Sequence, residues 1–273
     1  MGRRELSFAL TWQRNTEPVG AAVSELLRWL GTEIGRPVLP RVALSYDELL
    51  PMFQRGDVDF GWLPPLTFLE LREKKLARTL LSNRRNARRA FHAILAVRSG
   101  SRHDSVDRLR GARVAWVDPH STTGYVLARL DLVARGVDPG ATFGEERFYG
   151  SHDAAARAVF EGRSDVVGTF AEYDGERIAR AGFSTQGSGA DWRVIFRGRA
   201  SPSDALVAHP SADPAICASV QSALVRALET PKTAPFVRDV LHVDEFRVGE
   251  DERYDELADA IAAARKGGHF PHL

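Results

Sequence analysis

The chain has 273 residues, 44% of them hydrophobic and 27% charged, so it can bury a substantial core as one large domain or as two lobes. Its 37 basic and 36 acidic residues give a formal net charge of +1 and are largely interleaved, which argues against nucleic acid as a partner. The single cysteine, Cys217, excludes an internal disulfide and a thiolate metal cluster. Because Cys217 lies in an apolar helical stretch, we expect it in a core.

The first hundred residues alternate short strand patterns with longer helical ones. Strands are predicted at 6–10, 38–44, 57–63 and 93–97, and a helix at 18–35. Ser45 and Glu48 have the spacing of a capping box, which predicts a helix start there, and Pro51 should strain that helix at its middle. We interpret the basic run 84–89 as a solvated connection.

The strand and helix pattern restarts after the small residues 99–101. Strands are predicted at 113–117, 165–170, 192–196 and 205–208, helices at 124–135 and 154–161, and two helical stretches follow. Small-residue crossings near 98–101 and 198–203 suggest an inserted middle lobe. We therefore predict an α/β fold in which 1–98 and 201–273 form lobe I and 99–200 forms lobe II. Each lobe should hold a mainly parallel sheet flanked by helices, with a ligand cleft between the lobes.

The stretch 118–125, DPHSTTGY, places hydroxyl side chains where a predicted strand meets a predicted helix. Open α/β folds bind ligands at this carboxyl edge of the strands. The free N–H groups of a helix start, together with the hydroxyls of Ser121, Thr122 and Thr123, suit a tetrahedral oxyanion. Helix capping by itself explains the same residues. The stretch alone leaves both interpretations open.

Two further segments carry candidate ligand contacts. The segment 148–153, FYGSHD, repeats the strand-to-helix arrangement and puts His152 near a helix start, as a donor to the same anion or as a surface cap residue. Trp62, next to the last residue of the predicted strand 57–63 and ahead of two prolines, is either a core residue or a wall of the ligand cleft. We keep the cleft wall as its candidate role.

Motifs of enzymes and of membrane or exported segments are not found in this sequence. It has no HExxH, no GxSxG, no Walker lysine and no Cys–His pair with useful spacing. The segment 267–272 is interpreted as a frayed tail, so neither a metal nor a cofactor is predicted. No apolar run reaches the roughly 20 residues of a membrane span, and no export signal follows Met1. The protein is therefore cytoplasmic if the chain is full length.

Four segments together resemble the substrate-binding proteins of phosphate, phosphite and phosphonate ABC transporters. They are GDVDFGWLPPLTFL at 56–69, DSVDRLRGARVAWVDPHSTTGYVLARLDLVARGVDP at 104–139, YGSHDAAARAVFEGRSDVV at 149–167 and SPSDALV at 201–207. The resemblance runs from about residue 6 to about 245. It implies a two-lobed, type 2 periplasmic binding-protein fold, a location outside the cytoplasm and a transporter permease as partner. It also implies that Ser121, Thr122, Thr123 and His152 grip the phosphonate oxygens.

The resemblance also assigns residues to the rest of the ligand site. An aromatic ahead of the first-lobe helix implies Tyr46 as a contact. Aminoalkylphosphonate binders place two carboxylates against the ligand's ammonium, which implies Glu172 and Asp204. Phe91 stands where related proteins often present a tyrosine hydroxyl, so that one contact is either missing or supplied by His92.

We therefore expect a binding protein that closes by a hinge motion on a phosphonate bearing an amine, or on phosphate or phosphite. A leaderless intracellular sensor of the same ligands is one alternative. A second alternative is an enzyme of similar fold, in which His152 with Glu172 or Asp153 performs acid–base chemistry on a phosphorylated or pyrimidine-type substrate. A third is an interaction module whose cleft has lost its ligand.

Overall fold

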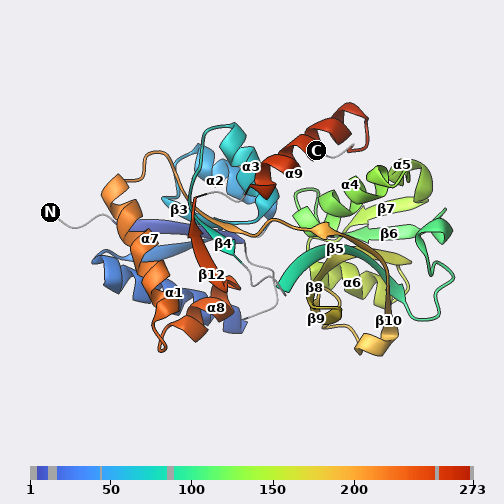
Figure 1. The fold of residues 1–273 in the computed structure, drawn as a ribbon, viewed down its shortest axis with the longest axis horizontal. Coiled ribbons are helices and arrows are strands. Elements are labelled where there is room, and N and C mark those ends of the chain that lie inside the picture. Colours follow the sequence, from blue (N-terminus) through green and yellow to red (C-terminus); the bar gives the residue numbers. More distant parts are fainter. Residues whose placement is uncertain (1–4, 12–16, 44, 85–88, 250–251, 271–273) are drawn as a thin grey trace. The chain divides into compact units, whose positions relative to one another are not determined.

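A computed structural model describes residues 5–11, 17–43, 45–84, 89–249 and 252–270. The chain divides into two compact units: unit 1 comprises Met1–Asn86 and Pro202–Tyr254, and unit 2 comprises Ala87–Ser201 and Asp255–Leu273. Figure 1 shows a sheet flanked by helices in each of them. The chain passes between the units three times, and the third passage lies within helix α9 (Arg253–Lys266), which the sequence did not foresee.

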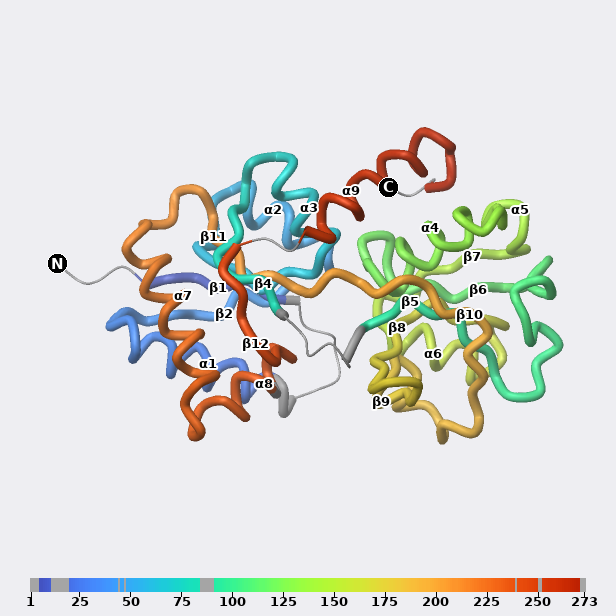
Figure 2. Tube along the Cα trace, in the orientation of Figure 1, coloured from blue at the N-terminus to red at the C-terminus, as the bar shows by residue number. Residues whose placement is uncertain are grey.

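Two segments that were expected in lobe I belong to unit 2. Strand β5 (Arg89–Arg98) pairs with β8 and β10 of the second sheet, as the trace in Figure 2 shows. The C-terminal residues are bound to unit 2 by Arg129, whose guanidinium donates to the carbonyl of His269 at 2.9 and 3.1 Å. The pairing of β5 and the hydrogen bonds of a buried arginine therefore decide that these two segments belong to unit 2. Neither contact can be seen in the composition of the sequence. Of the basic run 84–89, residues 85–88 lie outside the described residues.

The sheet of unit 1 has the strand order β12-β4-β11-β3-β1-β2. Its strands are β1 (Leu6–Thr11), β2 (Val38–Ala43), β3 (Phe60–Leu63), β4 (Arg78–Arg84), β11 (Ala205–Ala208) and β12 (Glu245–Val248). Strand β1 is parallel to β2 and to β3, whereas the β3–β11, β11–β4 and β4–β12 pairs are antiparallel. The sheet is therefore mixed, and only one half of it is parallel as predicted.

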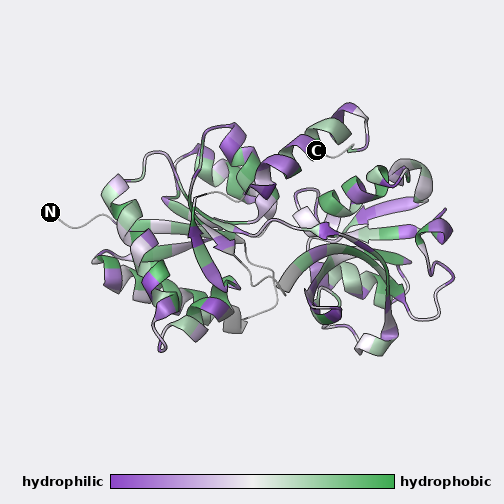
Figure 3. Cartoon of the chain, in the orientation of Figure 1, coloured by the Kyte–Doolittle hydropathy of each residue, from purple (hydrophilic) through white to green (hydrophobic). Residues whose placement is uncertain are grey.

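The helices of unit 1 are α1 (Glu17–Ile34), α2 (Leu49–Gln54), α3 (Pro65–Glu73), α7 (Pro214–Glu229) and α8 (Ala234–Leu241). Apolar residues of α1, α7 and α8 pack with the strands in one core, for example Leu27 and Val220 with Phe60. Figure 3 shows hydrophobic and hydrophilic residues mixed along α1, as expected of a helix with one buried face. Cys217 lies in this core as predicted, and burial raises the pKa of its thiol.

The predicted capping box at Ser45 is wrong. Its side chain makes no capping hydrogen bond; residues Tyr46–Glu48 form a 3-10 turn, and α2 begins only at Leu49. Pro51 consequently lies in the first turn of α2, where a backbone N–H has no partner within the helix, so the predicted strain does not arise. Its carbonyl accepts the N–H of Arg55 at 3.0 Å.

The sheet of unit 2 has the order β10-β5-β8-β6-β7, and β9 pairs with β8. Its further strands are β6 (Arg113–Trp116), β7 (Glu145–Phe148), β8 (Val166–Asp174), β9 (Arg177–Ala181) and β10 (Trp192–Ala200). Strand β6 is parallel to β7 and β8, and the remaining pairs are antiparallel, so this sheet is mixed as well. Its helices are α4 (Leu127–Ala134), α5 (Pro139–Thr142) and α6 (His152–Phe160).

Small side chains let α6 lie close to the sheet of unit 2. Ala155, Ala156 and Val159 pack there with Val167 and Ala171 of β8. Close packing of this kind fixes the start of α6 relative to the end of β8, because interiors are packed as densely as organic crystals. The position of His152, the first residue of α6, therefore follows from the core beneath it.

No helix in the described part of the chain is long and apolar enough to cross a membrane.

Candidate functional site

The hydroxyl-rich segment of unit 2 forms a π-helical turn, Thr122–Val126, between β6 and α4. The N–H of Val126 donates to the carbonyl of Ser121 at 3.1 Å, five residues back. Single π turns inside helices occur frequently at functional sites. The sequence predicted an ordinary helix from 124 and missed this turn.

Both interpretations of Ser121 are compatible with the structure. Its hydroxyl oxygen caps the turn by accepting the N–H of Gly124 at 3.1 Å, so the capping interpretation is confirmed. A hydroxyl that accepts one bond still has its own hydrogen to donate. Ser121 and Thr122 are buried and Thr123 is half-buried, while Asp118 shapes the preceding turn by accepting the N–H of His120 at 2.8 Å.

Two glycines allow the turn to lie directly on the sheet. A Cβ at Gly124 would come within 3.0 Å of Val117 and of the Ser121 hydroxyl. A Cβ at Gly168, on β8, would come within 3.0 Å of the Trp116 ring and 3.3 Å from the Gly124 carbonyl. The turn therefore packs on β8, and it contacts β5 as well. The hydroxyl side chains of the turn therefore lie at the same edge of the unit 2 sheet as the ends of β5 and β8.

His152 lies at the neighbouring helix start, where Ser151 caps α6 by accepting the N–H of Ala154 at 3.1 Å. His152 is buried, and its Nδ1 lies 2.7 Å from the Thr169 hydroxyl. Burial, aided by the positive charge of Arg180, lowers the pKa of His152 to about 4. The imidazole is therefore neutral at pH 7 and has a single N–H to donate.

Next to His152, an aromatic and charged cluster covers one face of β5, β8 and β9. The rings of Phe91 and Phe170 stack at 5.2 Å, and the ring of His152 lies edge-on to Phe170 at 4.9 Å. Glu172 lies opposite Phe91 in one strand pair and opposite Arg180 in the other. Its carboxylate is 3.4 Å from Nε of Arg180. We call Phe91, His152, Phe170, Glu172 and Arg180 the arginine cluster.

Two residues that the sequence suggested for the site, His92 and Asp153, point elsewhere. His92, the suggested substitute for a tyrosine contact, follows Phe91 in β5 and so faces the other side of the sheet, where its Nδ1 lies 2.8 Å from the Gly198 carbonyl. Asp153 forms an ion pair with Arg157 at 2.8 Å and accepts hydrogen bonds from Thr185 and Gln186. Asp153 is thereby occupied in holding α6 to a neighbouring loop.

Three predicted contacts lie in unit 1, at the carboxyl edge of its parallel strands. Tyr46 begins the 3-10 turn after β2, and Asp204 immediately precedes β11, whose first residue pairs with Leu63 at the end of β3. The backbone carbonyl of Asp204 accepts the N–H of Asn83 at 3.3 Å. Trp62 is half-buried in β3 and packs on the core of unit 1. Its ring lies edge-on to Phe246 at 6.2 Å.

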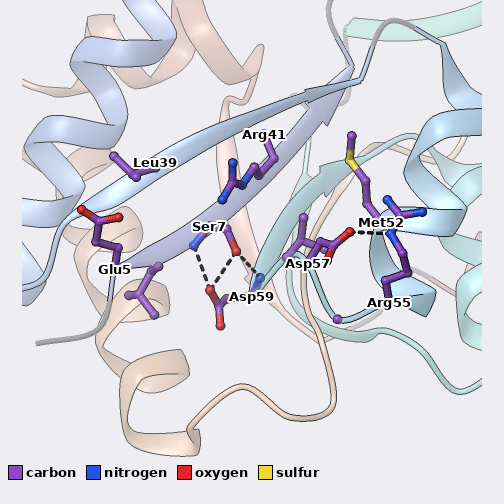
Figure 4. Close-up of a pocket in the computed structure, with 11 residues that line it drawn as sticks. Glu5, Ser7, Leu39, Arg41, Met52, Arg55, Asp57 and Asp59 are labelled. Atoms are coloured by element: carbon purple, nitrogen blue, oxygen red, sulfur yellow. Dashed lines mark hydrogen bonds and ion pairs between the residues drawn. The ribbon is translucent and has the colours of Figure 1, made fainter.

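A pocket of about 610 Å³ lies at the opposite, amino edge of the unit 1 sheet (Figure 4). Four of its polar residues bind one another in pairs: Asp59 accepts the N–H and the hydroxyl of Ser7, both at 2.8 Å, and Arg55 pairs with Asp57 at 2.6 Å. Ligands of open α/β sheets bind at the carboxyl edge. None of the predicted contacts lines this pocket, and we do not assign it a ligand.

Sequence reasoning missed Arg180, Thr169 and Phe170. Thr169 and Phe170 were inside a predicted strand but had no distinguishing pattern. Arg180 was missed because β9 was not predicted, although Asp174-Gly175 is a strong hairpin signal and Gly175 has the positive φ of 62° that such turns need. Among the described residues, no group of three metal-ligating side chains is close enough to hold an ion.

A scan of known families matches residues 8–254 to the periplasmic substrate-binding proteins of phosphonate ABC transporters. The match covers most of the chain, and the chain belongs to this family. It is a phosphonate-type solute-binding protein of an ABC transporter, in a family of binding proteins and not of enzymes. The resemblance drawn from the four sequence segments is therefore confirmed.

Solved structures share the fold over nearly the whole chain. A binding-protein component of a phosphonate transporter from Pseudomonas aeruginosa has 17% identity and a TM-score of 0.80, covering 98% of this chain and 90% of that one. PhnD1 of Prochlorococcus marinus, solved with methylphosphonate, has 15% identity and a TM-score of 0.78, covering 97% and 98%. XAC2383 of Xanthomonas citri, solved with chloride, has 20% identity and a TM-score of 0.78, covering 96% and 99%. The type 2 periplasmic binding-protein fold is thus established.

Proposed function

We propose that this protein binds a small phosphonate through the hydroxyl turn Ser121–Thr123 and His152 of unit 2. The observation that carries the proposal is the location of these groups at one sheet edge, with the turn packed on β8 and His152 bonded to Thr169 of the same strand. The methylphosphonate bound by the P. marinus relative supports this ligand class. The ligand is released unchanged, so no chemical step is involved.

The proposed donors are neutral, which suits an anion that must be bound and released. With Nδ1 of His152 accepting the Thr169 hydroxyl, the N–H at Nε2 is the one that donates to the ligand. Each hydroxyl of the turn also donates one hydrogen bond, and a hydrogen bond to a charged group contributes about 1.5–3 kcal/mol. A phosphonate presents three oxygens and therefore uses three or more such donors at once. In unit 1, Tyr46, Trp62 and Asp204 remain candidate contacts.

An aminoalkylphosphonate is the finer candidate that the sequence favoured. It requires acceptors for the ammonium, and Glu172 and Asp204 are the proposed pair. Glu172 already lies 3.4 Å from Arg180, so an ammonium has to compete with a guanidinium for the same carboxylate. Phosphate and phosphite offer the same tetrahedral oxygens without an amine, and they are tested alongside.

Isothermal titration with methylphosphonate, 2-aminoethylphosphonate, phosphate and phosphite tests the proposed function. We expect methylphosphonate to bind with a Kd well below 1 mM, a value equivalent to a binding free energy of about −4 kcal/mol. Mass analysis of ligand recovered from the complex should show it unaltered. If none of the four compounds binds tighter than about 1 mM, the proposed function is wrong.

A Thr122→Val variant is expected to weaken methylphosphonate at least fivefold, because the exchange removes a buried hydroxyl at nearly constant volume. Thr142→Val is the matched control, since Thr142 ends α5 beside Gly111, at the amino end of β6. The control should bind like the wild type. Equal affinity in Thr122→Val would remove Thr122 from the site.

A further inference from the structure

The side chain of Arg180 is held in place by packing against two aromatic rings, and most of its N–H groups are not used by the described residues. Its Cζ lies 5.3 Å from the centroid of the Phe91 ring and 5.2 Å from that of Phe170. Cations are attracted to aromatic faces, so the two rings fix the guanidinium plane. Its side chain remains 40% exposed, which leaves one side of the guanidinium open to solvent.

The guanidinium of Arg180 has five N–H groups. In the described part of the chain it forms no hydrogen bond, and its one polar contact is the ion pair of Nε with Glu172 at 3.4 Å. The two Nη groups therefore stay available in the fork geometry that matches a carboxylate or a phosphonate. An ordered guanidinium with unused donors is arranged to receive an anion.

Arg180 also supplies the positive charge of this cluster at neutral pH. His152 is uncharged there, and Arg157, on the same helix as His152, is engaged with Asp153. Glu172 offsets part of the charge of Arg180. Its own side chain is only 15% exposed, so a ligand reaches the guanidinium more easily than the carboxylate.

We propose that Arg180 is a specificity-determining contact, and that the preferred ligand is a phosphonate with a second anionic group, a phosphonocarboxylate. The proposal rests on the proposed function: the hydroxyl turn and His152 hold the phosphonate, and the Nη groups of Arg180 hold the carboxylate. An ammonium at Glu172 is disfavoured because Arg180 already pairs with that carboxylate. The guanidinium of Arg180 also covers the faces of Phe91 and Phe170, which would otherwise attract a ligand cation.

Titration of three ligands that differ only beyond the phosphonate tests this inference: methylphosphonate, phosphonoacetate and 2-aminoethylphosphonate. For the wild type we expect phosphonoacetate to bind at least tenfold tighter than 2-aminoethylphosphonate. Arg180→Gln should lose at least tenfold for phosphonoacetate, stay within threefold for methylphosphonate and gain for 2-aminoethylphosphonate. Arg180→Lys keeps the charge but loses the paired donors of the guanidinium. Its affinity for phosphonoacetate should therefore lie between those of the wild type and Arg180→Gln.

Arg177→Gln is the matched control, because Arg177 is an exposed arginine of the same strand. It should leave all three affinities unchanged, and the urea midpoints of all variants show whether they fold. The inference is overturned if 2-aminoethylphosphonate is the tightest ligand of the wild type, or if Arg180→Gln changes all three affinities equally. The proposed function survives either result as long as methylphosphonate binds. It fails separately if no phosphonate binds the wild type.

Discussion

Replacing Gly168 by alanine is expected to destabilise the protein by about 3 kcal/mol and to weaken methylphosphonate binding at the same time. The new Cβ would overlap the ring of Trp116, less than 3.0 Å away. Overpacking of a tight core costs about 1–3 kcal/mol and sometimes more. The cost should lie at the upper end of this range, because Trp116 has no room to yield.

Trp116 is held on several sides. It is fully buried, its Nε1 donates to Glu146 at 2.6 Å, and its ring lies edge-on to Tyr125 and Phe143. Trp116 also ends β6, directly ahead of the turn that carries the hydroxyls. A displaced tryptophan therefore moves Ser121–Thr123 away from the position in which we propose that they bind a phosphonate.

Urea unfolding and titration measure the two effects of Gly168→Ala. Gly189→Ala is the matched control, because a Cβ at Gly189 has no neighbour within 4 Å and this glycine has no positive φ. The control should keep both the urea midpoint and the affinity of the wild type. A Gly168→Ala protein with unchanged stability would show that Trp116 can move freely, and the packing argument for the turn would be lost.

The second large effect is a loss of stability at acid pH that comes from His152. An unfolded histidine titrates near pH 6.5, whereas burial, aided by Arg180, lowers the pKa of His152 to about 4 in the folded protein. Between these values the unfolded chain binds more protons, so the free energy of unfolding falls as the pH falls. Because of this lowered pKa, the free energy of unfolding is about 3 kcal/mol larger at neutral pH than in strong acid, at 1.36 kcal/mol for each pKa unit. Almost all of this difference is lost by pH 4.

The measurement compares wild type with His152→Asn in urea at pH 7.5, 5.5 and 4. Asparagine can keep the hydrogen bond to Thr169 but does not titrate. His92, whose pKa is also lowered by burial, contributes to both proteins, so the difference between them isolates His152. We expect the wild type to lose about 3 kcal/mol more than the variant between pH 7.5 and 4. Parallel pH profiles would show that His152 titrates in the folded protein as it does in the unfolded chain.

Most helices and strands with a clear hydrophobic periodicity were predicted from the sequence. The helix at 18–35 and the strand at 38–44 agree with α1 and β2 to within one residue at each end. The helix was found because its apolar residues recur at helical spacing on the side that packs in the core. Strands β4, β7, β9 and β12 were missed. They are short or charged, and β4, β7 and β12 are stabilised by pairing with strands far away in the chain, which no local pattern reports. Strand β9 forms a hairpin with β8, and the turn signal at Asp174-Gly175 was overlooked.

The sequence by itself determined the family, because four separate motifs occur in the family's order along the chain. It also located the hydroxyl turn, since helix starts have chemical requirements that Ser121 and Ser151 meet locally. The tertiary structure alone decided the charge of the site. Burial in the folded core removes the charge of His152, and the pairing of β9 with β8 brings Arg180 against Glu172. Desolvation and strand register arise only when the chain is folded, and they turn a carboxylate expected to receive an amine into one partner of an ion pair.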